Sequence, residues 1–150
     1  MDSYLILATP NDTPFIISFL SKMRDELGEL DTTDAVMSEA VQRSFSEQVK
    51  WFLFKDETGA YFGTCYLQSV HSYWSAQKRY YLGGFYILPE YRGQGRFGDL
   101  NKQLKNWVEQ NNGIQIFAHI HKDNEKSKES FESVEFEPTD YIYYARYWGE

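Results

Sequence analysis

One segment in the middle of the chain restricts the fold more than any other. The apolar run Phe85-Tyr86-Ile87-Leu88 ends at Pro89, and a glycine-rich turn, Gly93-Gln94-Gly95, precedes an amphipathic helix that starts near Arg96. Amides at a helix start have no acceptor within the helix and carry partial positive charge, and glycine lets the backbone approach a ligand closely. The segment therefore predicts a strand–turn–helix unit that binds an anion such as a pyrophosphate.

The turn differs from two familiar phosphate-binding loops. No Gly-Lys-Ser/Thr ends it, which excludes a Walker loop, and its glycine spacing does not fit the dinucleotide fingerprint. Arg92 and Arg96 are expected to add positive charge. Residues 61–110 carry six basic and three acidic side chains, so the segment has a net charge of +3 in a chain whose net charge is −7.

Hydrophobic periodicity predicts a single α+β domain over residues 1–150. The expected strands cover residues 4–8, 51–55, 61–69, 80–88, 114–121 and 141–148. The expected helices cover residues 14–27, 33–48, 96–111 and 125–134. Hairpins come first and strand–helix units follow, which predicts a mixed, mostly antiparallel sheet with about four helices.

Composition and charge limit the partners. A net charge of −7 argues against nucleic-acid binding, which needs a basic face. No apolar run approaches the roughly 18–20 residues that span a bilayer, and the first residues do not have the pattern of a signal peptide. The single cysteine, Cys65, excludes an internal disulfide and a cysteine-rich zinc site. We expect a cytoplasmic protein without a membrane or nucleic-acid partner.

Two motifs resemble those of one family. Ile87-x-Pro89-x-x-Arg92-Gly93-x-Gly95 resembles the acetyl-coenzyme A (acetyl-CoA) motif of the GCN5-related N-acetyltransferase (GNAT) family, Gln/Arg-x-x-Gly-x-Gly/Ala. Phe97 stands at its last position, and Gly98 follows. The run Asn124-x-x-Ser127-x-x-x-Phe131-x-x-x-Glu135-Phe136 is similar to the family's later motif, Asn-x-x-Ala/Ser-x-x-x-Tyr-x-x-x-Gly-Phe.

The resemblance implies a GNAT-like fold and acetyl-CoA as co-substrate, with no metal. It implies that strands 80–88 and 114–121 lie parallel and splay apart, with the pantetheine arm between them. Three strand residues and Asn124 would contact the arm; the strand residues are Phe85, Tyr86 and Ile87. The pyrophosphate would face the amides of Gly93, Gln94, Gly95, Arg96, Phe97 and Gly98.

The resemblance also implies transfer of an acetyl group to a primary amine of a small molecule or protein. The amine must lose a proton, and His119 stands where one branch of the family has a glutamate, so we expect His119 to be the base. The family's usual acid is a tyrosine, but this chain has Phe131. Coenzyme A is acidic enough to leave as a thiolate, and Tyr141, Tyr143 or Tyr144 could supply a hydroxyl.

Acidic residues between the first two expected helices suggest a wall that attracts a cationic amine, or alternatively a solvated loop. They are Asp25, Glu26, Glu29, Asp31 and Asp34. Only 14 residues follow Phe136, so a second subunit could complete the family's closing hairpin in a homodimer.

Two other interpretations stay open. Phe97, Phe131 and Glu135 depart from the family pattern and favour a catalytically weak or inert CoA-binding or protein-interaction module. Alternatively, His119, His121 and Asp123 could bind a metal ion in a small metal-dependent enzyme.

Overall fold

The computed structural model describes residues 2–28 and 30–149. The chain forms two compact units, a larger one that ends at His119 and a smaller one that begins at Ile120. Each is described by itself below.

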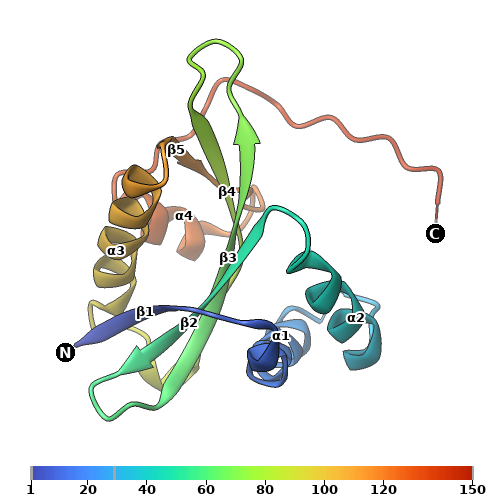
Figure 1. Cartoon of the computed structure of the whole chain (residues 1–150), viewed down its shortest axis with the longest axis vertical. Coiled ribbons are helices and arrows are strands. Elements are labelled where there is room, and N and C mark those ends of the chain that lie inside the picture. The colour runs from blue at the N-terminus through green and yellow to red at the C-terminus, as the bar shows by residue number, and fades with distance from the viewer. Residues whose placement is uncertain (1, 29, 150) are drawn as a thin grey trace. The chain divides into compact units, whose positions relative to one another are not determined.

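A five-stranded mixed sheet forms the larger unit (Figure 1). Its strands lie in chain order: β1 (Ser3–Leu7), β2 (Val49–Asp56), β3 (Tyr61–His71), β4 (Lys78–Ile87) and β5 (Gly113–Phe117). The first three pairings are antiparallel, and β4 pairs with β5 in parallel. The predicted mixed, mostly antiparallel α+β fold is therefore confirmed.

Helices cover both faces of this sheet. Helices α1 (Thr13–Leu27) and α2 (Asp34–Ser44) lie on one side, and α3 (Arg96–Gln110) lies on the other (Figure 1). A 3-10 turn η1 (Pro10–Asp12) precedes α1, and η2 (Pro89–Tyr91) follows β4. Helix α4 (Glu125–Glu132) belongs to the smaller unit. The part of the chain that is described thus has the four predicted α-helices.

Alternation along β2 builds a core on each face of the sheet. Trp51 and Leu53 lie in one buried cluster with residues of α1 and α2, such as Ile16 and Val41. Phe52, on the opposite face, packs edge-to-face against Trp107 of α3, with ring centroids 5.4 Å apart. Aromatic side chains supply much of the apolar area in both layers.

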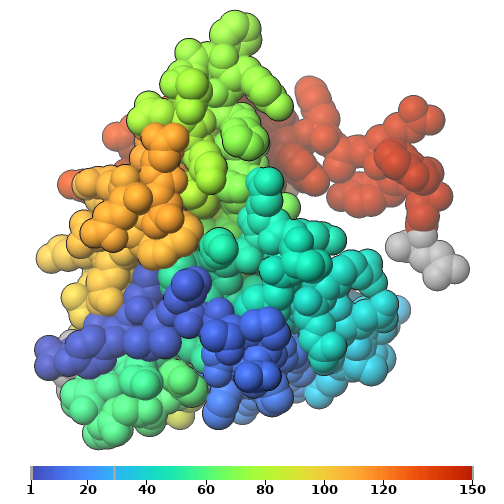
Figure 2. Space-filling view, in the orientation of Figure 1, coloured from blue at the N-terminus to red at the C-terminus, as the bar shows by residue number. Residues whose placement is uncertain are grey.

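A long connection joins β3 and β4. It projects from the larger unit at the top of the space-filling view (Figure 2). Tyr73 and Trp74, in this connection, are almost completely exposed.

Two strand predictions near the carboxyl end were wrong. Strand β5 ends at Phe117 rather than His121, because the chain turns: Asn124 N–H donates to the His121 carbonyl at 2.9 Å, just before α4. Residues 141–148 form no strand. Their aromatic side chains are exposed, and an alternating sequence becomes a strand only with a hydrogen-bonded neighbour.

Candidate active site

The glycine-rich turn has the backbone geometry that its sequence predicts. Gly93 and Gly95 have φ angles of +74° and +80°, a region that favours glycine. Gly95 is the N-cap of α3, and the first backbone hydrogen bond of that helix joins Asp99 N–H to the Gly95 carbonyl at 3.2 Å. The amides of residues 93–98 therefore precede the helical hydrogen-bond ladder, where an anion is stabilised.

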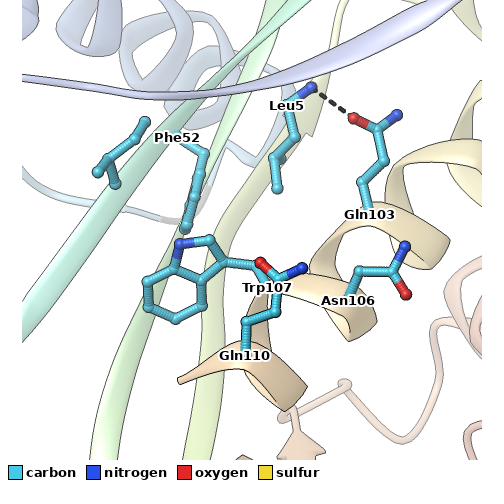
Figure 3. A pocket seen from close by; sticks show the side chains of 7 residues that line it. Leu5, Phe52, Gln103, Asn106, Trp107 and Gln110 are labelled. Atoms are coloured by element: carbon cyan, nitrogen blue, oxygen red, sulfur yellow. Dashed lines mark hydrogen bonds between the residues drawn. The ribbon is translucent and has the colours of Figure 1, made fainter.

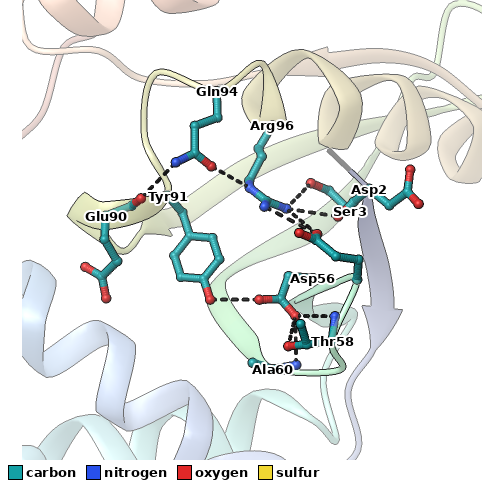
Figure 4. Close-up of polar contacts among 10 residues, drawn as sticks. Asp2, Ser3, Asp56, Thr58, Ala60, Glu90, Tyr91, Gln94 and Arg96 are labelled. Atoms are coloured by element: carbon teal, nitrogen blue, oxygen red, sulfur yellow. Dashed lines mark hydrogen bonds and ion pairs between the residues drawn. The ribbon is translucent and has the colours of Figure 1, made fainter.

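Arg96 holds this turn in place through its side chain (Figure 4). The side chain is only 3% exposed, and Nη1 donates to the Asp2 carbonyl at 2.9 Å and to Ser3 Oγ at 3.2 Å. The guanidinium also lies about equally far from the rings of Phe62 and Tyr91, at 5.1 and 5.0 Å. The guanidinium therefore joins the start of α3 to β1, and its contribution of charge to the anion site stays a prediction.

A second anchor joins the turn to the hairpin between β2 and β3. The Asp56 carboxylate accepts hydrogen bonds from the Thr58 hydroxyl at 2.7 Å, from the Tyr91 hydroxyl at 2.8 Å and from the amides of Thr58 and Ala60 (Figure 4). These donors hold the pKa of the Asp56 carboxyl well below its ordinary value. The glycine-rich turn is thus held in place by contacts with residues distant in the sequence, which the spacing of its glycines does not reveal.

Arg92 follows η2, five residues after the last residue of β4, and is partly exposed. Its Nε donates to the Ile87 carbonyl at 2.8 Å, and its Nη2 donates to Glu26 Oε2 of α1 at 2.9 Å. The guanidinium also lies 5.3 Å from the centre of the Tyr86 ring. Arg92 therefore positions the end of α1 beside the end of β4.

Strand β4 contains a bulge that the sequence analysis missed. Thr64 pairs with Tyr86 and Tyr66 pairs with Gly83, so Gly84 and Phe85 together lie opposite one residue of β3. Gly84 adopts a φ of +58°, which favours glycine. The adjacent glycines Gly83 and Gly84 are the sequence signal from which this bulge could have been predicted.

Pairing between β4 and β5 ends just before this bulge. It covers Lys78 to Tyr81, and the last pair is Tyr81 with Phe117. Among the described strands, residues Leu82–Ile87 of β4 pair only with β3. This end of pairing fits the splay that the family resemblance implies.

The predicted strand residues of the site contribute side chains to the core. Phe85 packs against Phe54 and Phe97, with ring centroids 5.1 and 5.2 Å apart, while Tyr86 and Ile87 are buried. Phe97, which departs from the family motif, therefore packs against the bulge from the α3 side. Because these side chains lie in the core, only backbone groups of β4 would contact the pantetheine arm of acetyl-CoA. That these residues bind the coenzyme stays a prediction.

An aromatic row lies on the α1 and α2 face, where the β4–β5 pairing ends. The Tyr66 ring is 4.9 Å from Trp51 and 6.1 Å from Tyr81, and the Tyr81 ring is 5.0 Å from His119. The structure thus places the predicted base beside Tyr81, which in turn lies next to Tyr66. Neither tyrosine was identified from sequence, because only the strand register shows that they share a face.

Asn124 lies in the smaller unit, where it caps α4. Its Oδ1 accepts a hydrogen bond from Ser127 N–H at 3.1 Å. In the same unit the rings of Phe131 and Phe136 pack edge-to-face with centroids 5.0 Å apart. This motif therefore forms a helix cap and a small apolar contact, and the contact of Asn124 with the coenzyme stays a prediction.

The proposed acidic wall consists largely of paired charges. Arg24 contacts Asp25 at 3.2 Å and Asp34 at 2.8 Å, and Glu26 pairs with Arg92. Asp31 is exposed, and Glu29 lies outside the described residues. Much of the negative charge expected to attract an amine is thus compensated within the protein.

The described part of the larger unit has pockets between its helices and its sheet. One, of about 310 Å³, lies between α2 and strands β2 and β3, and its lining includes Trp51, Tyr66 and the carboxylate of Glu47. The other, of about 250 Å³, lies between β1 and α3 (Figure 3). No titratable side chain is among its lining residues, which are Leu5, Leu7, Phe52, Gln103, Asn106, Trp107 and Gln110. Of these two pockets, only the first therefore has titratable side chains in its lining, those of Glu47 and Tyr66.

Two searches of residues 2–28 and 30–149 gave negative results. They contain no group of three or more histidine, cysteine, aspartate or glutamate side chains placed to hold a metal ion. They also contain no helix with the length and apolar character needed to cross a membrane.

Solved structures share this fold at low sequence identity. A possible acetyltransferase from Clostridium difficile 630 is 18% identical with a TM-score of 0.87, covering 99% of both chains. A predicted acetyltransferase from Clostridium acetobutylicum, solved with acetyl-CoA, is 14% identical with a TM-score of 0.78, covering 97% of this chain and 96% of its own. A ribosomal-protein-alanine N-acetyltransferase from Brucella melitensis biovar Abortus 2308 is 13% identical with a TM-score of 0.79, covering 99% of this chain and 100% of its own.

Two sequence comparisons, with curated proteins and with family models, gave different results. A search of curated proteins finds no match. The sequence model of the acetyltransferase (GNAT) family matches residues 18–136, which include the glycine-rich turn, the bulge and the Asn124 motif. This chain therefore belongs to the GNAT acetyltransferase family.

Proposed function

We propose that the protein transfers the acetyl group of acetyl-CoA to a primary amine of a small molecule or a protein. The observation that carries the proposal is the combination of an anion-binding helix start with the β4 edge that β5 leaves unpaired. The amides of residues 93–98 fit the pyrophosphate, and the β4 backbone between Gly83 and Ile87 fits an extended amide-containing arm.

His119 is the proposed base. It lies two residues after the end of β5, its side chain is exposed, and its ring contacts Tyr81. The neutral imidazole of a histidine can accept the ammonium proton. The neutral nitrogen then bonds to the acetyl carbonyl carbon, the carbon–sulfur bond breaks, and the coenzyme leaves as a thiolate. The nitrogen loses its remaining extra proton to give the neutral amide.

The pocket between α2 and the sheet supports a cationic acceptor. Glu47 is the one carboxylate in its lining, and Trp51 and Tyr66 offer aromatic faces. Aromatic faces and a carboxylate together stabilise an ammonium group. With much of the acidic wall paired, this pocket is the better candidate for the acceptor. We also propose a cytoplasmic location, since the single cysteine, Cys65, is buried and unpaired.

The test combines ligand binding with turnover. Acetyl-CoA should raise the melting temperature of the protein, and a panel of primary amines should show release of coenzyme A thiol with at least one acceptor. His119→Ala should lower kcat/KM by about 100-fold without changing acetyl-CoA affinity, whereas the neighbouring control His121→Ala should retain activity.

Three results separate the alternatives. Stabilisation by acetyl-CoA without turnover of any amine would favour the inert binding module. The absence of both would contradict the proposal. Full activity of His119→Ala would remove His119 from the mechanism while leaving acetyl transfer intact.

A further inference from the structure

We propose that the Tyr66 hydroxyl is the proton donor to the departing coenzyme thiolate. This inference rests on the proposed acetyl transfer and assigns a role that the later family motif leaves unfilled, because its tyrosine position is Phe131.

The Tyr66 side chain crosses from β3 to β4. A Cβ atom built on Gly83 would lie only 2.4 Å from both Cζ and Oη of Tyr66, and one built on Gly84 would lie 3.2 Å from Cδ2. The hydroxyl end of the ring therefore lies directly against the β4 backbone, immediately before the bulge. Only glycine at position 83 leaves room for it.

The thioester is expected at the same place. The anion-binding turn follows the carboxyl end of β4, so an arm that starts there and follows the strand edge runs from Ile87 back toward Gly83. Beyond Gly83, β5 occupies this edge, since its pairing ends at Tyr81. The far end of the arm, which carries the acetyl group, thus comes to the backbone that the Tyr66 hydroxyl covers.

The surroundings keep Tyr66 protonated. Burial is the main cause that raises the pKa of its hydroxyl above the ordinary value near 10, and the neighbouring Tyr81 adds to it. At neutral pH the group is therefore a donor rather than a phenolate, as a general acid must be.

The aromatic row also closes the proton balance. His119 passes the first proton, from the ammonium group, to solvent and takes a second proton from the nitrogen once the carbon–nitrogen bond has formed. The thiolate takes one proton from Tyr66. Tyr81 lies between these two groups, with ring distances of 5.0 Å to His119 and 6.1 Å to Tyr66, and can relay the proton from the imidazolium to the phenolate. The products are then the N-acetyl amine and the neutral thiol, with both side chains restored.

The test is Tyr66→Phe, which removes one oxygen and keeps the ring. We expect kcat to fall at least tenfold, with the acetyl-CoA dissociation constant, measured by calorimetry, unchanged within twofold. Tyr61→Phe is the matched control, because Tyr61 is a half-buried tyrosine of the same strand, packed against Phe15 at its other end, and should keep the wild-type kcat.

The outcomes distinguish this inference from the proposed function. Wild-type kcat in Tyr66→Phe would overturn the role of Tyr66 and leave acetyl transfer standing. A wild-type protein that turns over no amine would overturn both. Should Tyr66→Phe lose acetyl-CoA binding in proportion to its loss of kcat/KM, with kcat unchanged, the residue would be a binding group and the proton-donor role would be refuted.

Discussion

The Tyr91 hydroxyl donates a 2.8 Å hydrogen bond to Asp56 Oδ2, joining the turn before α3 to the hairpin between β2 and β3. The two residues are far apart in the sequence, and only the folded sheet brings them together. The glycine-rich turn before α3 is therefore held by a carboxylate that must stay ionised.

The first prediction concerns the pH dependence of stability. The pKa of Asp56 is lower in the folded state than in the unfolded state, so its contribution is complete above the unfolded pKa of about 3.9 and is lost as the pH falls. Asp56→Asn should therefore lower the urea midpoint at pH 6 and flatten its decline between pH 5 and pH 2. The exposed control Asp31→Asn should follow the wild-type curve, and an equally steep decline in both variants would contradict the assignment.

The second prediction concerns the close approach of Gly83 and Tyr66. Gly83→Ala forces the Tyr66 ring to move and should lower the free energy of unfolding by about 1–3 kcal/mol, a typical cost of overpacking. In a Tyr66→Ala background the same change should cost less, because the clashing ring is gone. Urea unfolding of the four proteins gives the coupling energy; additive effects would show that the two residues do not meet in solution.

The third prediction concerns the positive φ of Gly95. Gly95→Ala should raise the dissociation constant for acetyl-CoA and cost about 1–2 kcal/mol of stability, since alanine disfavours the left-handed conformation. Gly59→Ala is a control with similar strain, at φ +90°, in the hairpin between β2 and β3. Calorimetry should show weaker binding only in the first variant, and equal binding losses would mean that stability alone is being measured.

The fourth prediction concerns the single thiol. Cys65 is completely buried, and burial raises the pKa of its thiol well above the ordinary value, which leaves almost no thiolate. A thiol reagent should therefore react with the native protein only at the rate of unfolding, and with one thiol per chain in denaturant. Rapid reaction of the native protein would contradict the buried position.

The fifth prediction concerns the exposed aromatic residues near the carboxyl end. Tyr141, Tyr144 and Trp148 are 92%, 89% and 87% exposed, and such a cluster usually marks an interaction surface. We expect sedimentation velocity to detect a homodimer of the full chain that disappears when residues 141–150 are deleted. Monomers at all concentrations would contradict the expected dimer.

Local signals predicted the first helix and the helix after the turn almost completely. Helix α3 was expected over residues 96–111 and covers Arg96–Gln110, and α1 ends beside Gly28 as expected. These boundaries depend on glycine positions and capping groups a few residues apart, which a sequence shows directly.

Register and long-range contacts could not be predicted in this way. The bulge at Gly84, the position of Tyr66 over Gly83 and the burial of the Arg96 guanidinium all depend on which strand residues face each other. Periodicity assigns a residue to a strand but does not align that strand with its neighbour. The predicted strand over residues 141–148 was wrong for the same reason, since alternation does not supply a partner.

The side chain of Gln103 hydrogen-bonds to the open edge of β1, which is the edge strand opposite β5. Its Oε1 accepts from Leu5 N–H at 2.9 Å (Figure 3). Its Nε2 donates to the Ser3 carbonyl at 2.7 Å. The Gln103 amide thus satisfies one N–H and one carbonyl group on the open edge of β1. These are groups to which a strand of another protein chain would otherwise hydrogen-bond. Gln103 therefore protects this border of the sheet against unwanted aggregation.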